Sequence, residues 1–559
     1  MKITRYIVPL SFLCVAAFSA QAQDKKIEEK PVSEEIEIVR PYKPVLADAF
    51  KLRRSPDLEN LQIYRARFNY TVNDRRLEMN SDINKLEAEK MASIRPEILM
   101  NNYIKLGAGN MGTMLAEGYV ATGSDEALQA GLFFRHFGQK GSIEGQNENH
   151  QQLTAFGKSI LDQFSVKGKL NFQRQGFGFY GFDPMVAPVS SVAKQAISVI
   201  EGEGEISSNF TEDENALSYA AKLNLYTLKD MFEAKENLFS LSANVNKRIS
   251  NLNLGLAFST EMGKTSDVQT SSNANILRLN PYIRLQTNGV NITAGARFVQ
   301  EFGSYSDTKI FPAVTADLTL IPDYLQLFGE VNGDVNRNTL RDLTNSNPFL
   351  GTNQFLENSV EKLNITAGIK GANGPGFGYK VQIYSKKIGN MPLFVNRFGD
   401  VSRFDIIYDR GNTNVTGIQG ELSVQISNNL FWNGKLIGEQ YKPASEMHSW
   451  LKPEIRLSSD FAYTIGEKLT LNASIYMQGK SKVKVYTSAP SSPYVVDFNT
   501  EQTQVIKAFV DLGAGLDYKI NKQFGAFVKV NNFLNQSYNR YLYYPSFGAS
   551  IFGGLSYSF

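Results

Sequence analysis

Long stretches of this chain alternate between apolar and polar residues with a period of two. In the last stretch, one face carries Ile551, Leu555, Tyr557 and Phe559, while the other face carries largely serine and glycine. A period of two predicts a β-strand with one apolar face. An apolar face on a terminal strand promotes aggregation in water. We therefore interpret this stretch as a strand whose outer face meets lipid.

The same alternation recurs from Tyr103 onward, for example over residues 252–259, 290–298, 418–426 and 469–477. Each segment is close to the length that a tilted strand needs to cross a bilayer. The pattern predicts roughly 22 strands, and an even number places both ends of a barrel on the same side of the membrane. The strands are expected to begin near Tyr103, Met114, Leu128, Gln152, Val166, Glu203, Ala216, Leu238, Leu252, Ile276, Val290, Phe311, Tyr324, Lys362, Phe377, Arg403, Leu430, Trp450, Leu469, Val505, Phe524 and Phe547.

The connections between these strands alternate in length. Short turns are expected at 287–289, 321–323, 373–376, 427–429, 465–467 and 521–522. Longer polar loops are expected at 139–150, 180–201, 334–360, 387–402, 481–503 and 533–546. A soluble sandwich would also have half-buried strands, but not this steady alternation of turns and loops. The sequence therefore predicts an all-β, transmembrane antiparallel β-barrel over residues 101–559, with short turns in the periplasm and long loops outside.

The amino-terminal residues read as a signal peptide. Lys2 and Arg5 precede a short apolar stretch, and Ala20 and Ala22 supply a cleavage site, so we expect residues 1–22 to be removed. No later stretch approaches the roughly 20 apolar residues of a membrane helix. The single cysteine, Cys14, lies inside the predicted signal peptide. These features predict secretion to the outer membrane of a Gram-negative bacterium.

Residues 23–100 differ from the rest of the chain. They begin with a run rich in Lys and Glu, and then contain Pro41, Tyr42, Lys43 and Pro44. We expect a short periplasmic extension that is partly disordered. It is either a tether or small periplasmic cap, or a docking segment through Pro41–Pro44 for a periplasmic or lipoprotein partner.

Three parts of the chain resemble a known family. They are the closing residues 524–535, 541–548 and 553–559, with Asn-Asn-Phe-Leu-Asn and Tyr-Pro elements; the opening strand Tyr103–Thr113; and the lead-in Pro41–Phe50. Together they resemble TonB-dependent receptor-like barrels of the Bacteroidota type. The resemblance implies an outer-membrane barrel inserted by the barrel-assembly machinery, which would read Leu555, Tyr557 and Phe559.

The chain departs from this family at its amino-terminal side. The resemblance implies a complete plug domain inside the barrel, and residues 23–100 are too few and too charged for one. A wide barrel without a plug would leak, so something should fill it. Inward-folded loops are one candidate, through Tyr180, Phe182 and Met185 or through the loop 334–360. A partner protein is the other candidate.

The sequence offers no pattern for catalysis or for a cofactor. His136, His150 and His448 lack neighbouring residues for a catalytic set, and the Asp334–Asn338 stretch lacks the Gly and Glu of a calcium loop. We expect no enzyme activity, no cofactor and no metal site. The formal net charge of +3 gives no indication of nucleic-acid binding.

Two functions remain open at this point. One is a passive pore, whose lumen would be lined by Arg297, Glu421, Lys507 and Asp511. The other is the membrane subunit of an envelope complex, which would have occluding loops and a partner bound to the amino-terminal segment. An alternative is a TonB-powered transporter whose plug is supplied by a partner. In each case the expected surroundings are outer-membrane lipid and lipopolysaccharide.

Overall fold

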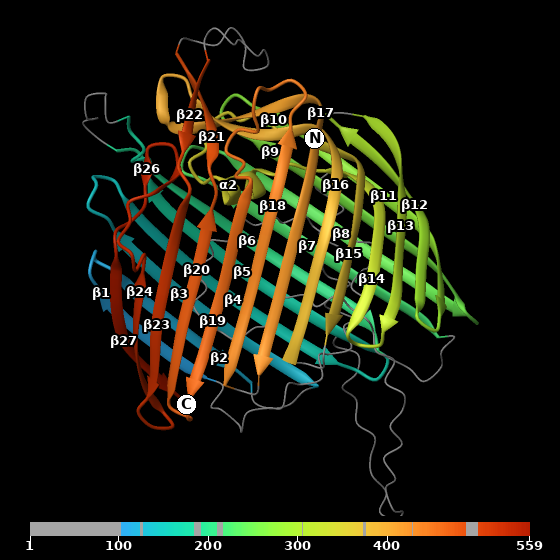
Figure 1. The fold of residues 1–559 in the computed structure, drawn as a ribbon, viewed down its shortest axis with the longest axis horizontal. Helices are drawn as coiled ribbons and strands as arrows, with labels where there is room; N and C mark the ends of the chain where they lie inside the picture. Colours follow the sequence, from blue (N-terminus) through green and yellow to red (C-terminus); the bar gives the residue numbers. More distant parts are fainter. Residues whose placement is uncertain are drawn as a thin grey trace, which may run out of the picture. The chain divides into compact units, whose positions relative to one another are not determined.

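The computed structural model describes residues 102–122, 127–183, 192–209, 216–304, 306–372, 376–426, 429–487 and 501–559. The predicted signal peptide, the extension 23–100 and the motif Pro41–Pro44 lie outside these residues. The described residues form a large antiparallel β-barrel (Figure 1). Its main sheet has 23 strands, of which β10 is a two-residue strand that pairs only with β9. The other 22 strands form the wall, which confirms the predicted fold and strand number.

The first half of the wall contains β1 (Tyr103–Gly109), β2 (Met114–Ala121), β3 (Leu128–Lys140), β4 (Asn147–Ile160), β5 (Phe164–Gly178), β6 (Lys194–Ser208), β7 (Leu217–Lys229), β8 (Lys235–Ile249), β9 (Leu252–Ser266), β11 (Ala274–Thr287) and β12 (Val290–Gly303), with β10 (Ser271–Ser272) beside β9. The second half contains β13 (Asp307–Ile321), β14 (Leu325–Asn336), β15 (Ser359–Ala372), β16 (Phe377–Arg397), β17 (Asp400–Ile426), β18 (Leu430–Lys442), β19 (Ile455–Ile465), β20 (Leu469–Gln478), β23 (Phe509–Lys519), β24 (Phe524–Asn531) and β27 (Ser550–Ser558). Outside the wall lie helix α2 (Leu340–Ser346) and the small hairpins β21 (Ser481–Tyr486) with β22 (Glu501–Ile506) and β25 (Asn539–Tyr541) with β26 (Tyr544–Pro545).

The barrel closes between its first and last strands. β1 pairs antiparallel with β27 over seven residues, from Tyr103 opposite Ser558 to Gly109 opposite Phe552. Small residues face each other at the centre of this seam, where Gly107 lies opposite Gly554. A Cβ atom added to Gly554 would lie 1.8 Å from the carbonyl oxygen of Leu106. The seam therefore requires glycine at this position.

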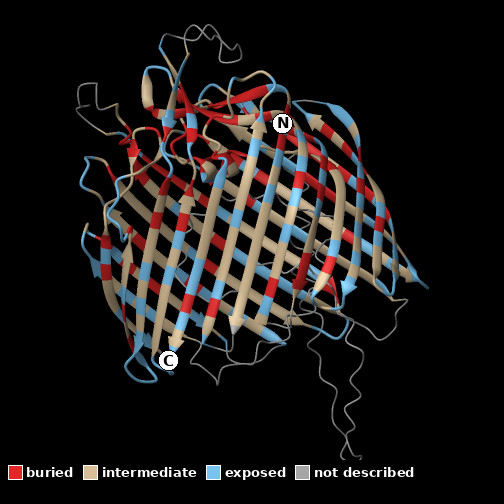
Figure 2. Ribbon diagram, viewed as in Figure 1, coloured by how far each residue is buried: buried red, intermediate tan, exposed pale blue. Residues whose placement is uncertain are grey.

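The wall shows the predicted two-face pattern. In β12, Ile292 and Phe298 are exposed on the outer face, whereas Thr293, Arg297 and Val299 on the other face are buried. Figure 2 shows this alternation of exposed and buried positions along the strands. In water an outer face of exposed Leu, Ile, Val and Phe would be unfavourable, but it is the face that lipid requires. No helix in the described part of the chain is both long enough and apolar enough to cross a membrane.

The two ends of the barrel differ. One end, which we call the short-turn end, holds the start of β1 and the end of β27, together with brief connections such as 250–251, 288–289 and 466–468. The opposite end, which we call the long-loop end, holds the connections 179–193, 337–358, 443–454, 479–508 and 532–549.

The predicted loop 387–402 is wrong. β16 and β17 continue beyond the wall as one long hairpin, with 21 and 27 residues, and turn only at 398–399. Met391, Leu393 and Val395 pack into one apolar cluster, while Phe394 on the opposite face packs into another. Because both faces are covered, the segment has no apolar–polar alternation to reveal a strand. The loop 139–150 is also shorter than predicted, since β3 ends at Lys140 and β4 begins at Asn147.

Candidate functional site

Folded segments span the mouth of the barrel at the long-loop end. We call them the cover: residues 179–183, 337–358, 391–409 and 541–545. Together with the adjoining wall they contain the largest buried apolar cluster of the described chain. Members of this cluster come from β5–β8 and from β16–β17, which are separated in the wall by β9 and β11–β15. The cluster therefore joins two distant parts of the rim, and Figure 2 shows buried residues concentrated at this end.

The β16–β17 hairpin supplies the part of the cover that crosses the mouth, and we call residues 391–409 the lid. Its two strands are irregular at the same level: the register shifts between Gly389 and Met391, and Arg410 and Gly411 have no partners on β16. Asn390 has φ 58° and Gly411 has φ 113°, both in the left-handed region. A bulge bends a strand pair locally. The lid therefore leaves the wall direction here, and in Figure 1 the first part of β17 lies across the top of the barrel.

Aromatic rings hold the inner face of the lid. Phe404 is fully buried and lies beside the rings of Tyr541 and Tyr544. Tyr544 in turn stacks on Phe349, with the ring centroids 3.6 Å apart, and packs edge-on against Tyr180. The expected inward position of Tyr180 therefore matches its burial here, whereas Met185 lies outside the described residues. Tyr541 and Tyr544, in the connection between β24 and β27, are thus packed into the cover.

The lid also contacts the far rim through its tip. The guanidinium of Arg403 lies 4.8 Å from the ring centroids of both Phe179 and Phe232. Its Nε atom is 3.2 Å from a carboxylate oxygen of Asp400. Cation–π contacts of this kind are strengthened when water is excluded. Arg403 thus fastens the tip of the lid to the connections that follow β5 and β7.

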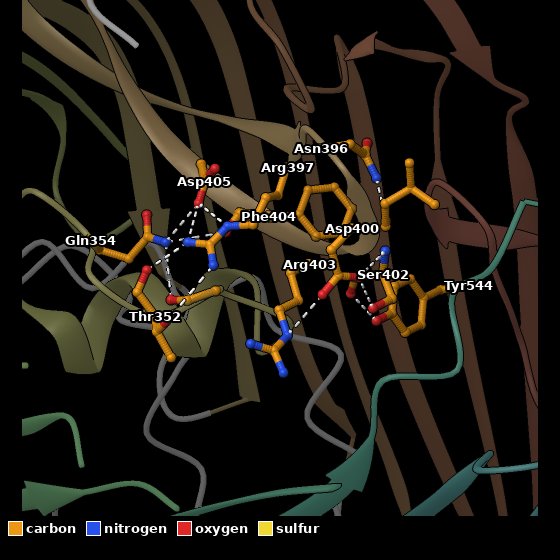
Figure 3. A network of polar contacts seen from close by, with 12 residues as sticks. Thr352, Gln354, Asn396, Arg397, Asp400, Ser402, Arg403, Phe404, Asp405 and Tyr544 are labelled. Atoms are coloured by element: carbon orange, nitrogen blue, oxygen red, sulfur yellow. Dashed lines mark hydrogen bonds and ion pairs between the residues drawn. The ribbon is translucent and has the colours of Figure 1, made fainter. Parts of the chain in front are cut away.

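A polar network ties the lid to the connection 337–358 (Figure 3). Arg397 donates to the carbonyl oxygen of Thr352 at 2.5 Å and to Asp405 at 2.8 Å. Gln354 accepts a hydrogen bond from the backbone N–H of Ile406 at 2.8 Å. The hydroxyl of Tyr544 donates to the carbonyl oxygen of Ser402. Burial raises the pKa of Tyr544 well above its ordinary value, so this hydroxyl keeps its proton in neutral and mildly alkaline solution.

The short helix α2 is fixed to the wall by two carboxylates. Glu236 on β8 is fully buried and accepts hydrogen bonds from the backbone N–H groups of Leu340 and Arg341, at 2.7 and 3.2 Å. It also accepts from the Tyr226 hydroxyl at 2.6 Å. Glu201 on β6 receives a two-pronged contact from Arg341, at 2.8 and 2.9 Å. Bidentate Arg–carboxylate pairs are directional as well as strong, so both contacts define where the helix sits.

The outer face of the lid is braced as well. Trp450 is buried against Met391, Leu393 and Val395 and donates to Glu446 at 2.7 Å. Lys484 on β21 is fully buried between Glu446 and Glu501, at 2.7 and 2.6 Å. The lid is therefore packed on both faces, and its position is determined by the chain itself.

Beneath the cover lies a chamber of about 610 Å³. Its lining comes from β6–β9 on one side and from β16–β18 on the other, so it spans the lumen. The lining is charged but largely paired: Arg278 contacts Glu261 and Asp334, and Arg456 contacts Glu439. Arg337 differs, because its buried Nη1 atom has no acceptor among the described residues. Asp334, in the stretch 334–338 that lacks the Gly and Glu of a calcium loop, lies at the end of β14 and pairs with Arg278 and Arg297.

The structure places the four predicted lumen residues as follows. Arg297 on β12 is buried and pairs with Asp334 at 3.0 Å, and Glu421 on β17 pairs with Lys435 at 3.2 Å. Asp511 on β23 is buried and accepts from Tyr538 at 2.6 Å. Each of these three lies on the strand face opposite the exposed apolar residues.

Lys507 lies outside the wall, because β22 ends at Ile506 and β23 begins at Phe509. The sequence extended the alternation of β23 three residues too far. A lumen-lining role for the four residues stays a prediction.

The structure shows where the other predicted residues lie, while their roles stay predictions. Leu555, Tyr557 and Phe559 are exposed on the outer face of the terminal strand segment, where assembly factors could read them. His150 is on β4 beside Glu148, and His448 lies near Lys482 and Trp450. Sequence reasoning missed Glu236. It placed Arg403 and Trp450 at the starts of strands, whereas Arg403 lies inside β17 and Trp450 is buried ahead of β19. The sequence signal for Glu236 is weak. It is one carboxylate on the inward face of β8, and that face also carries other polar residues, so nothing in the sequence distinguishes it.

The closed 22-stranded wall with its lipid-facing exterior defines a transmembrane β-barrel of the outer-membrane class. Solved structures with the same fold include FpvA of Pseudomonas aeruginosa bound to a pyoverdine, at 14% identity and TM-score 0.60, covering 82% of this chain and 71% of that one. The FrpB iron transporter of Neisseria meningitidis matches at 10% identity and TM-score 0.61, covering 84% and 82%. The siderophore receptor PirA of Acinetobacter baumannii matches at 12% identity and TM-score 0.57, covering 82% and 80%.

These likenesses establish the fold. No family model matches the sequence, and no curated protein matches it either. FrpB is named as an iron transporter and PirA as a siderophore receptor.

Proposed function

We propose that this protein is a membrane-embedded subunit of an envelope complex, a receptor-type barrel whose outer mouth is kept shut by its own chain. The observation that carries the proposal is the lid, which crosses the mouth and is packed on both faces. A passive pore needs an unobstructed path for solute, whereas an obligate subunit of a complex is expected to have occluding loops. The cover favours the second function.

The proposed partner site is the amino-terminal segment, with Pro41, Tyr42, Lys43 and Pro44 as its expected contact residues. The test compares the full-length protein with a variant that lacks residues 24–95, both purified from membranes with the same affinity tag. We expect the variant to fold as a heat-modifiable barrel and to lose stoichiometric envelope partners.

Two controls make this comparison decisive. Substitution of Pro41–Pro44 by Ala-Ala-Ala-Ala should reproduce the loss, whereas substitution of the charged run Glu34–Glu37 should not. Retention of the same stoichiometric partners by the deletion variant would contradict docking through this segment. Recovery of the full-length protein without any stoichiometric partner would contradict the proposed subunit role.

A second candidate is a TonB-powered transporter whose plug is supplied by a partner. The chamber favours it, because about 610 Å³ could hold a compact ligand and Arg337 offers a buried donor there. The likeness to iron and siderophore receptors in fold points the same way. Uptake of a ligand that stops when the proton gradient is dissipated would support this candidate over the first.

A further inference from the structure

A hollow of about 680 Å³ lies in the wall at β6–β9, below the long-loop end. Most of its lining belongs to the outer face of the barrel. Ile200, Leu225 and Met262 are 64%, 46% and 44% exposed, and all three line the hollow together with Phe239 and Gly202. Gly202 has no side chain to fill the space. The wall therefore has a shallow apolar depression on the surface that faces lipid.

The apolar surface ends at the same level on three adjacent strands. Above Leu225, Phe239 and Met262, the outer-face residues of β7, β8 and β9 become polar. The register places Thr227 opposite Asn237, and Asn237 opposite Lys264. A change from apolar to polar outer residues marks the boundary between the hydrocarbon and headgroup regions. The upper rim of the hollow therefore lies at headgroup level in the leaflet at the long-loop end.

Three lysines gather at this rim. Lys229 at the end of β7 lies directly opposite Lys235 at the start of β8, and Lys264 on β9 is one outer-face position away. Like charges that lie directly opposite each other across strands are destabilising. Within the described part of the chain, no carboxylate pairs with any of the three. The cluster thus has an electrostatic cost that an external anion would offset.

The neighbouring carboxylates do not supply that anion. Asp230 accepts from the backbone N–H groups of Phe232 and Ala234, and Asp267 accepts from that of Val268. Glu233 is exposed in the turn between β7 and β8. An anion at the rim would therefore meet three lysines beside one exposed carboxylate, Glu233, and two carboxylates that are turned toward backbone N–H groups.

We propose that this region binds one phosphate-bearing acyl lipid of the leaflet at the long-loop end. The acyl chain lies in the hollow of Ile200, Leu225, Phe239 and Met262, and the phosphate contacts Lys229, Lys235 and Lys264. Lysine suits this position, because its stem packs on apolar surface while the ammonium group reaches the headgroup level. The proposal depends on the barrel lying in the outer membrane and not on whether the barrel transports or conducts.

The test uses full-length protein, washed free of lipid in detergent and titrated with bis-phosphorylated lipid A, with retention measured by native mass spectrometry. The triple variant Lys229→Gln, Lys235→Gln, Lys264→Gln should bind lipid A about 100-fold more weakly, since each lysine near an anionic surface contributes about fivefold. The double variant Lys387→Gln, Lys442→Gln is the matched control. Both of its lysines are exposed in the long-loop halves of their strands, away from the hollow, and it should bind as the wild type does.

A second pair of variants tests the hollow. Leucine at Gly202 would fill it, and an added Cβ meets only Leu170 Cδ2 at 3.5 Å, so the strand tolerates the change. Gly202→Leu should weaken lipid A binding, whereas Gly204→Leu, where an added Cβ meets nothing within 4 Å, should not.

Three results would overturn the proposal. The first is equal retention of lipid A by the triple lysine variant and the wild type. The second is equally tight binding of a neutral digalactosyl diacylglycerol, which would mean that phosphate is not recognised. The third is complete displacement of lipid A by millimolar inorganic phosphate, which would mean that the acyl chain contributes nothing.

Discussion

Glu236 shows how one residue connects the wall to the cover. It is placed by β8 on the inward face, and its carboxylate receives two backbone N–H groups at the start of α2. The hydroxyls of Tyr226 and Thr265 donate to the same carboxylate, at 2.6 and 2.8 Å. A buried carboxylate is expensive unless its lone pairs are satisfied. Four donors satisfy this one, so the charge becomes a fixed attachment point.

Removal of this attachment should loosen the connection 337–358 without opening the wall. In Glu236→Ala, buried donors lose their acceptor, which costs about 3 kcal/mol. The amide protons of 337–358 should then exchange with solvent about 100-fold faster, because about 1.4 kcal/mol corresponds to a tenfold change. Hydrogen–deuterium exchange with mass spectrometry measures this directly.

The control for this variant is Glu205→Ala. Glu205 lies on β6 at the other end of the wall, with a 3.3 Å contact to Lys167 that is partly exposed. It should leave exchange in 337–358 unchanged. Unchanged exchange in Glu236→Ala itself would show that α2 does not depend on this carboxylate.

At the scale of elements, the seam between β1 and β27 is where the pairing register of two strands can be tested most directly. Gly554→Ala would force a Cβ atom to within 1.8 Å of the Leu106 carbonyl oxygen, and backbone on both strands leaves little room for adjustment. We expect the folded, heat-modifiable form to disappear from membranes. Semi-native gel electrophoresis of membrane fractions would measure it.

Gly118→Ala is the matched control for the seam. It lies on β2, where an added Cβ would meet only the Tyr103 carbonyl oxygen at 3.8 Å. This variant should assemble as the wild type does. Normal assembly of Gly554→Ala would mean that the two terminal strands pair in a different register.

The sequence predicted the number and order of the wall strands, although it began β6 at Glu203 instead of Lys194. It missed the lid, for a physical reason. A strand between lipid and lumen has two unlike environments, so β12 alternates visibly between Ile292 or Phe298 and Thr293 or Arg297. The lid lies between two apolar clusters, so Leu393 and Phe394 are both buried and the alternation disappears. Glycine, asparagine and proline at 389–392 then suggested a loop. In the structure Asn390 lies at the bend that turns the hairpin over the mouth.

At the scale of the whole molecule, the wall can be predicted from the local pattern of residues. The cover cannot, because it is held by contacts between residues that are far apart in the chain. The order and number of the strands could be read from periodicity. The contact of Arg403 with Phe179 and Phe232 joins residues that are more than 170 positions apart, and no local pattern indicates it. Tyr180 was a partial exception, since an aromatic residue in a polar loop of a wide barrel suggested an inward fold.

The central claim is that the chain itself closes the long-loop end of the barrel. Single-channel recording of the purified full-length protein in planar bilayers tests it most directly, beside a variant in which Gly-Gly replaces the lid residues 391–409. We expect the wild-type protein to show no steady conductance and the variant without the lid to form large, steady channels. A large and steady conductance from correctly folded wild-type protein would contradict the account.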